Sequence, residues 1–276
     1  MLEGAYTRLH DRAEQVRSEV PRLTPYDVLK RTEATQGSFA WGWAAPSEIG
    51  EVINSFNAWA LQLHVWRLWN DVLQSYPSED DHWEISSHFI EPVAYFCMMQ
   101  PASLSERLAI SAEFALHQAN LYVFDGEKDE LDEDKKKPGD YLKKKERIQQ
   151  LQRLGSRWPR FDAFFEAHKD LNGRIYRERT KNFRNLSAHA FPPRLQFGYL
   201  HRVKREVVNP DVSGGRSVSY TMLEIPPLDF HDMQVANLEE YQKGLVAIDR
   251  FLSLIDGLCD AINARNEERQ KKNAAD

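Results

Sequence analysis

Residues 47–76 read SEIGEVINSFNAWALQLHVWRLWNDVLQSY, and this stretch decides the fold class. Its large apolar residues recur at steps of three, four and seven, which is the spacing of one face of an α-helix. They are Val52, Phe56, Trp59, Leu63, Trp66 and Leu73. A long helix with so many aromatic side chains on one face needs partner helices that bury them. The stretch therefore predicts a mainly α-helical protein.

The composition is that of a globular chain with an acidic balance. The chain has 276 residues, of which 42% are hydrophobic, enough to build one large domain or two small ones. Because the net charge is −6, any contact with nucleic acid must come from a local basic patch. The two isolated cysteines, Cys97 and Cys259, offer no spacing for a metal cage and suit a reducing compartment.

No segment of the sequence predicts membrane contact. The N-terminal residues lack the apolar core of a signal peptide. The longest uninterrupted apolar run, Val93 to Met99, is far too short to cross a bilayer. We therefore expect a cytoplasmic protein without a membrane partner.

Helix breakers divide the rest of the chain. Residues 1–46 are expected to form N-terminal helices and a loop that pack on the bundle, and residues 47–276 to form one helical domain. Within that domain, Pro101 is expected to end a helix over 83–99. Ser103 followed by Glu106 resembles a capping box that opens the next helix. The last helix is expected to run from about residue 230 into residue 266.

Two segments depart from the helical pattern. Residues 126–140 read GEKDELDEDKKKPGD, and these blocks of charge predict a solvated, mobile linker. Apolar and polar residues alternate over 195–208 and again over 216–225, on either side of a turn at 209–215. We therefore expect a β-hairpin over residues 195–225, inserted before the C-terminal helix.

The residues best suited to chemistry lie in the string RNLSAH, residues 184–189, near the end of a helix expected over about 174–190. The imidazole of His189 is suited to exchange protons at cellular pH. Arg184 is suited to hold a phosphate with two donors and to stabilise the added charge of a pentacovalent phosphorane. Asn185 is suited to orient the substrate or the imidazole. With a 2′-hydroxyl as the internal nucleophile, such a site needs neither a metal nor a cofactor.

The spacing limits how these residues meet. Asn185 and His189 share one helix face, whereas Arg184 lies five residues before His189, about 140° round an ideal helix. They converge on one atom if the last turn loosens, or if a second copy of the helix supplies the other side. Arg177 and Lys181 form a basic stripe with Arg184 at i, i+4 and i+7, either for RNA phosphates or as a solvated face.

The string resembles the motif of the HEPN superfamily, in which an Arg, a following polar residue and a His a few positions later lie near the end of a helix. The resemblance implies a HEPN-like helical bundle that pairs so that two motifs face one cleft. It implies a metal-independent endoribonuclease, with Arg184 and His189 as the catalytic pair and Asn185 in support. It also implies an RNA substrate, a homodimer and, in toxin–antitoxin or phage-defence systems, an antitoxin or regulatory protein. The hairpin is outside the minimal bundle.

Other interpretations remain open from the sequence. The sequence also fits a non-catalytic module that binds a nucleotide or a protein, or a structural helical dimer, but neither function requires the histidine. Glu113 and His117 lie at i and i+4 and fit either a metal or cleft site or a hydrogen-bonded polar spot in the core. The absence of a third ligand with suggestive spacing favours the polar spot.

Overall fold

The computed structural model describes residues 2–137, 139–208 and 217–274, and it confirms a mainly helical protein. The chain divides into two compact units. One unit, called here the motif unit, comprises residues 1–20, 62–99 and 174–238. The other, called here the core unit, comprises residues 21–61, 100–173 and 239–276. No described helix is long and apolar enough to cross a membrane.

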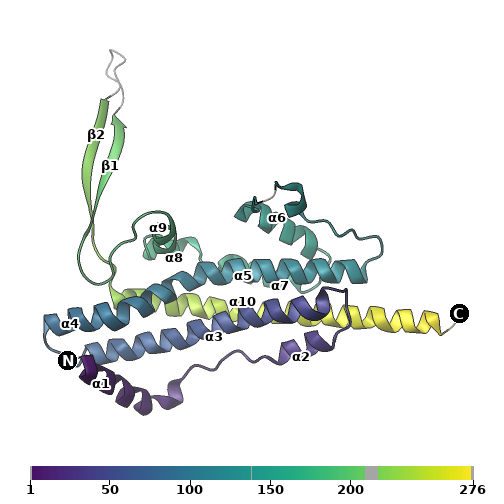
Figure 1. Ribbon diagram of the computed structural model, residues 1–276, viewed down its shortest axis with the longest axis horizontal. Helices are drawn as coiled ribbons and strands as arrows, with labels where there is room; N and C mark the ends of the chain where they lie inside the picture. Colours follow the sequence, from purple (N-terminus) through teal and green to yellow (C-terminus); the bar gives the residue numbers. More distant parts are fainter. Residues whose placement is uncertain (1, 138, 209–216, 275–276) are drawn as a thin grey trace. The chain divides into compact units, whose positions relative to one another are not determined.

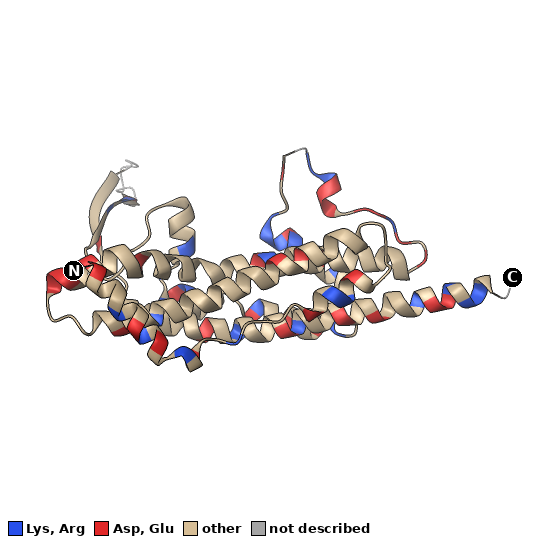
Figure 2. Ribbon diagram, turned by 60° about the horizontal axis from the view of Figure 1, so that its bottom comes forward, with Lys and Arg blue, Asp and Glu red and all other residues tan. Residues whose placement is uncertain are grey.

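Three long helices contribute residues to both units. They are α3 (Trp41–Leu73), α5 (Glu91–Val123) and α10 (Phe230–Asn273). The core unit also contains α2 (Asp27–Ala34), η3 (Asp132–Lys135), α6 (Lys144–Gly155) and α7 (Phe161–Asp170). Acidic and basic residues are interspersed along these helices, as Figure 2 shows for the C-terminal part of α10.

An aromatic cluster joins α3 to α10 within the core unit. Phe56 stacks on Tyr241 with ring centroids 4.9 Å apart, and Trp59 meets the same tyrosine edge-on at 5.3 Å. Gly244 makes this approach possible, because a Cβ at that position would lie 2.9 Å from the Phe56 ring and 3.3 Å from Trp59. Phe56 and Trp59 are almost fully buried, as the periodicity of residues 47–76 predicts.

The motif unit contains short helices and the only sheet that the described residues form. Its helices are α1 (Leu2–Gln15), η1 (Arg17–Glu19), α4 (Glu79–Ile85), η2 (Ser86–Ile90), α8 (Arg174–Arg179) and α9 (Phe183–His189). Trp69 of α3 stacks on Phe89 of η2, with centroids 4.2 Å apart and planes 6° from parallel. Arg12 of α1 donates to Asp71 of α3 at 2.8 Å. The N-terminal helix is therefore held to α3 by a side-chain contact.

Two boundaries predicted from prolines were wrong. α3 begins at Trp41, so Pro46 lies inside the helix, and the helix starts before the boundary expected between residues 46 and 47. Pro101 lies inside α5, which continues from Glu91 to Val123 without the expected interruption. Buried neighbours such as Met98 and Leu104 flank this proline. Their packing outweighs the cost of about 3 kcal/mol that an interior proline imposes on a helix.

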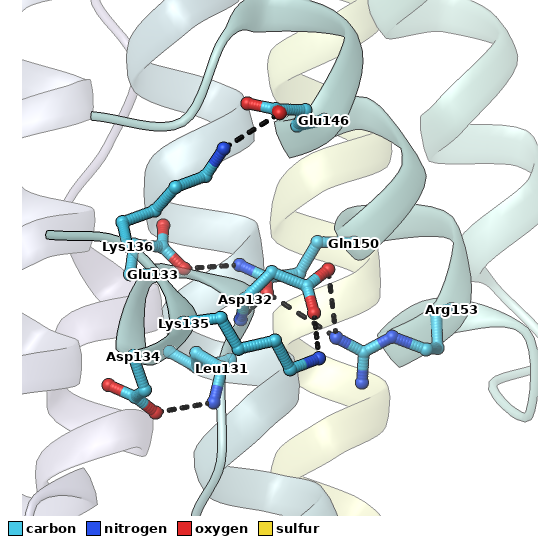
Figure 3. Close-up of polar contacts among 9 residues, drawn as sticks. All are labelled: Leu131, Asp132, Glu133, Asp134, Lys135, Lys136, Glu146, Gln150 and Arg153. Carbon is cyan, nitrogen blue, oxygen red and sulfur yellow. Dashed lines mark hydrogen bonds and ion pairs between the residues drawn. The ribbon is translucent and has the colours of Figure 1, made fainter. Parts of the chain in front are cut away.

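The charged segment over residues 126–140 has more local structure than its composition predicts. Asp132–Lys135 forms the 3₁₀-helix η3. Figure 3 shows how its side chains reach α6: Glu133 accepts from Gln150 at 2.8 Å, and Asp132 pairs with Arg153 at 3.4 Å. Lys136 donates to Glu146 at 2.8 Å. These contacts explain how a segment with one apolar residue, Leu131, folds against a helix, and its mobility stays a prediction.

The predicted hairpin is confirmed by β1 (Leu200–Val208) and β2 (Ser217–Ile225), which pair antiparallel. Its expected first boundary at residue 195 was wrong, because Gln196 and Gly198 adopt left-handed backbone conformations that interrupt an extended strand. The register places Leu200 opposite Ile225 and Val208 opposite Ser217. The ribbon extends away from the helices of its unit (Figure 1). The predicted turn over residues 209–215 lies outside the described residues.

A close contact at the end of α6 gives a test of the core unit. A Cβ at Gly155 would lie 2.1 Å from the Phe161 ring, whereas a Cβ at Gly42 of α3 meets nothing within 4 Å. We expect Gly155→Ala to lower the free energy of unfolding by about 1–3 kcal/mol through overpacking. Gly42→Ala, the matched control, should be neutral or stabilise by less than about 1 kcal/mol. Equal unfolding curves for the two variants in denaturant would contradict this packing.

Candidate functional site

The predicted single helix over residues 174–190 is wrong, because the chain breaks between α8 and α9. Lys181 and Asn182 adopt left-handed backbone conformations, with φ of 47° and 56°. The Lys181 amide donates to the Glu178 carbonyl at 3.1 Å, and the Asn182 amide donates to the Arg177 carbonyl at 2.6 Å. These bonds close the end of α8 and start α9 in a new direction.

Buried side chains fix both helices on either side of this break. Tyr176 of α8 is buried, and its hydroxyl donates to the Met98 carbonyl at 3.4 Å and to Asn237 at 3.3 Å. Phe183, the first residue of α9, is 2% exposed and meets Tyr95 edge-on at 5.4 Å. The position of α9 in its unit therefore depends on packing at its first turn.

α9 carries the whole RNLSAH string. Arg184 is half-buried, and its Nη1 donates to the Asn185 side-chain oxygen at 3.4 Å. His189, the last residue of α9, is exposed. The next amide, that of Ala190, still donates to the Leu186 carbonyl at 2.8 Å. The helix therefore continues up to His189, and on a regular helix positions 184 and 189 lie about 140° apart around the axis.

The expected basic stripe does not form along one helix. Arg177 is exposed on α8, whereas Lys181 lies in the break and its ammonium donates to the Pro226 carbonyl at 3.3 Å. Arg184 belongs to the next helix. The i, i+4, i+7 spacing requires an unbroken helix, so the left-handed pair at 181–182 removes the alignment. The contact at Pro226 instead ties the break to the end of the hairpin.

Glu113 and His117 of α5 are both buried, and each has a partner. Arg147 donates to Glu113 at 2.8 Å, and His117 Nε2 lies 2.8 Å from an Asp129 oxygen. Burial raises the pKa of Glu113, while hydrogen bonds from Gln150 and Arg147 and the charge of Arg147 oppose the rise. This geometry is the hydrogen-bonded polar spot that the sequence favours. In the described part of the chain, no three His, Cys, Asp or Glu side chains are grouped to hold a metal ion.

A cavity of about 230 Å³ in the core unit was not predicted from the sequence. Its polar lining comes from Ser105, Glu106, Lys144, Arg147 and His168, and the other lining side chains are apolar. His168 is 2% exposed and its Nε2 lies 2.8 Å from the Ser105 carbonyl; burial lowers its pKa, which favours the neutral ring. These residues come from α5, α6 and α7, and no spacing in the sequence brings them together.

Comparison with known proteins adds no relative to this description. No family model matches the chain, and searches of curated proteins and of solved structures return no match. The functional interpretation therefore depends on the geometry and chemistry of the residues themselves.

The buried Glu113 carboxylate gives a prediction with a charge-matched control. Arg147→Ala removes the positive charge that faces buried Glu113 and leaves Gln150 as its remaining hydrogen-bond donor, and we expect it to lower the free energy of unfolding by about 2–4 kcal/mol. Arg153→Ala removes an arginine that is 53% exposed and pairs with Asp132, so its cost should stay below about 1 kcal/mol. Chemical denaturation of the two variants measures the difference.

The loss of unfolding free energy caused by Arg147→Ala should also depend on pH. A carboxyl whose pKa is higher in the folded state than in the unfolded state binds protons more readily when folded. The contribution of that group to the free energy of unfolding therefore rises as the pH falls through the raised pKa. We expect the gap between Arg147→Ala and the wild type to narrow from about pH 7 to about pH 5. A gap that widens over this range would show that Glu113 is not the group left unpaired.

Proposed function

We propose that the protein is a metal-independent endoribonuclease of the HEPN type, with Arg184 and His189 as its catalytic residues. One observation carries the proposal: a single short helix, α9, presents Arg184, Asn185 and an exposed His189. The buried Phe183 holds this helix, so the three side chains are placed by packing. The toxin or defence role implied by the resemblance, with its antitoxin or regulatory partner, belongs to the same proposal.

The chemistry follows from an internal nucleophile. A base accepts the proton of the ribose 2′-hydroxyl, and the 2′-oxygen attacks the neighbouring phosphorus. The bond from phosphorus to the 5′-oxygen breaks, and an acid protonates that leaving oxygen. The products are a 2′,3′-cyclic phosphate and a 5′-hydroxyl. His189 serves as base or acid, Arg184 stabilises the phosphorane, and Asn185 orients the substrate or the imidazole.

A second copy of the chain completes this site. The divergence of Arg184 and His189 on a regular helix leaves one copy without convergent groups. The reaction also needs both a proton acceptor and a proton donor, and each copy offers one histidine in the motif. A two-fold axis supplies both. Exposed apolar side chains lie near the string, with Ile175 75% exposed and Phe191 65% exposed, which fits a contact between copies.

The RNA-binding role of Arg177 and Lys181 is retained in a modified form. Arg177 is exposed on α8, and its proposed role is to contact a phosphate outside the cleavage site. Lys181 already donates to the Pro226 carbonyl, so it would contact RNA only by exchanging that bond.

Substitution at the motif tests the catalytic assignment. Arg184→Ala and His189→Ala should each reduce cleavage of a mixed RNA substrate by about a hundredfold or more, because each removes a group that acts in the transition state. The melting temperature of His189→Ala should stay close to that of the wild type, since the side chain is exposed. Arg174→Ala is the control, because Arg174 is an exposed arginine on neighbouring α8.

Three outcomes separate the possible functions. Loss of cleavage in both motif variants but not in Arg174→Ala supports the ribonuclease. A wild type that binds RNA or a nucleotide without cleaving any RNA shows a binding module instead. Cleavage that survives both substitutions shows that the site lies elsewhere.

The products of cleavage test the mechanism separately. Cleavage should persist in EDTA, because the 2′-hydroxyl, His189 and Arg184 supply the nucleophile, the proton transfer and the charge stabilisation. The 5′ fragment should end in a 2′,3′-cyclic phosphate, or in its hydrolysis product, and the 3′ fragment should begin with a 5′-hydroxyl. Mass spectrometry of the fragments distinguishes these ends. A strict need for a divalent cation, with 5′-phosphate products, would contradict the mechanism.

A further inference from the structure

The two faces of the hairpin differ in character. The register sets Val203 opposite Met222, Arg205 opposite Tyr220 and Val207 opposite Val218, so these side chains share one face, together with His201 and Glu224. The other face carries mostly polar residues, with apolar ones among them: Arg202, Lys204, Glu206, Ser217, Ser219, Thr221, Leu200, Leu223 and Ile225. Between residues 203 and 207 and their partners the first face is mainly apolar, with Arg205 as its one charged side chain, and it is called here the apolar face.

The apolar face is uncovered in the single chain. Val203, Tyr220 and Met222 are 61%, 67% and 63% exposed. Figure 1 shows the two strands standing clear of the helices of their unit. A two-stranded hairpin is marginally stable by itself in water, and a contiguous exposed apolar patch marks an interaction surface. Tyr220 is the one aromatic side chain among the five apolar residues of this face, and the four aliphatic ones do not stack on bases, so the surface fits a protein partner better than a single-stranded nucleic acid.

The two edges of the ribbon differ as well. β1 carries Arg202, Lys204 and Arg205, and Lys204 pairs with Glu206 on the same strand. Charged side chains, lysine above all, discourage another strand from pairing with an edge. β2 has no charged residue from Ser217 to Leu223. Its edge is therefore the one that accepts a further strand.

Residues of the same chemical type also lie at equal distances on either side of Tyr220 in the sequence of β2. Ser219 and Thr221 flank it with hydroxyls, and Val218 and Met222 follow with apolar side chains. In an antiparallel pair of identical strands centred on Tyr220, Ser219 lies opposite Thr221 of the second copy, and Val218 opposite its Met222. Hydroxyl then meets hydroxyl and apolar meets apolar, which is how stable cross-strand pairs are built.

We propose that β2 pairs antiparallel with β2 of a second copy of this chain, so that two hairpins form a four-stranded sheet with Tyr220 at its two-fold axis. The pairing satisfies the backbone groups of the free edge and joins the two apolar faces into one larger surface. In a dimer of two chains, one axis relates every element of one copy to its counterpart. The inference rests on the hairpin alone and does not require the chain to cleave RNA.

A charge exchange at position 220 tests the proposal. Each copy meets its own position 220 at the axis, so Tyr220→Lys should raise the dimer dissociation constant by at least about tenfold through repulsion of like charges. Tyr220→Glu should raise it less, because Arg205 lies opposite position 220 within each hairpin and offsets the added negative charge. An equimolar mixture of the two variants should dimerise again, because lysine then faces glutamate. Val203→Lys is the control: it adds the same charge to the apolar face, but on β1, away from the seam. Its dissociation constant should change by less than about threefold. Sedimentation velocity measures all four samples.

Four results would overturn the proposal. The first is a wild type that stays monomeric at roughly 100 µM, and the second is a Tyr220→Lys variant that dimerises normally. The third is a mixture of the lysine and glutamate variants that fails to pair. The fourth is a Val203→Lys variant whose dimerisation is as impaired as that of Tyr220→Lys. The last result would indicate packing of two apolar faces instead of edge pairing. Loss of RNA cleavage with normal dimers would refute only the ribonuclease, and dimers that form by another surface would refute only the hairpin assignment.

Discussion

The close approach of α10 to α3 within the core unit is the constraint on which the helical framework depends. It exists because position 244 has no side chain: a Cβ there would meet Phe56 at 2.9 Å. Because the glycine leaves this space open, the rings of Phe56, Trp59 and Tyr241 pack against one another. Burial of large aromatic side chains stabilises a protein by about 1.5–3 kcal/mol each, so this cluster secures the two helices along the face that the sequence periodicity marks.

The parts of the fold that follow from periodicity were predictable. The apolar spacing of residues 47–76 identified α3, and the alternation on either side of residues 209–215 identified the two strands. The parts that depend on tertiary packing were not. Pro101 was expected to end a helix by its local chemistry, but buried neighbours keep α5 continuous through it. The segment over 126–140 was expected to be a solvated, mobile linker, and the contacts of its carboxylates with Gln150 and Arg153 of α6 were not foreseen.

The candidate site was predictable in its residues and not in its geometry. The motif spacing selects Arg184, Asn185 and His189, but no local rule places a helix break three residues before Arg184. Asparagine adopts the left-handed conformation at low cost, so Asn182 was a possible boundary; Lys181 gave no such signal. Tertiary contacts stabilise the break, because Phe183 is buried and the Lys181 ammonium donates to the Pro226 carbonyl. It separates the motif from Arg177 and leaves Arg184 and His189 divergent on one short, regular helix, so the ribonuclease account requires a second chain.

Mixing wild-type protein with an inactive variant tests directly whether cleavage requires a second chain. Wild-type protein is co-assembled with about a fourfold excess of His189→Ala, and activity per wild-type chain is compared with wild type mixed with the same excess of an unrelated protein. If two copies of the motif form one cleft, random pairing leaves about one fifth of the wild-type chains with a wild-type partner, and activity per wild-type chain falls to about that level. Activity per wild-type chain that does not change, in samples where mixed dimers have been demonstrated, would show that one chain cleaves RNA alone and would contradict the composite site.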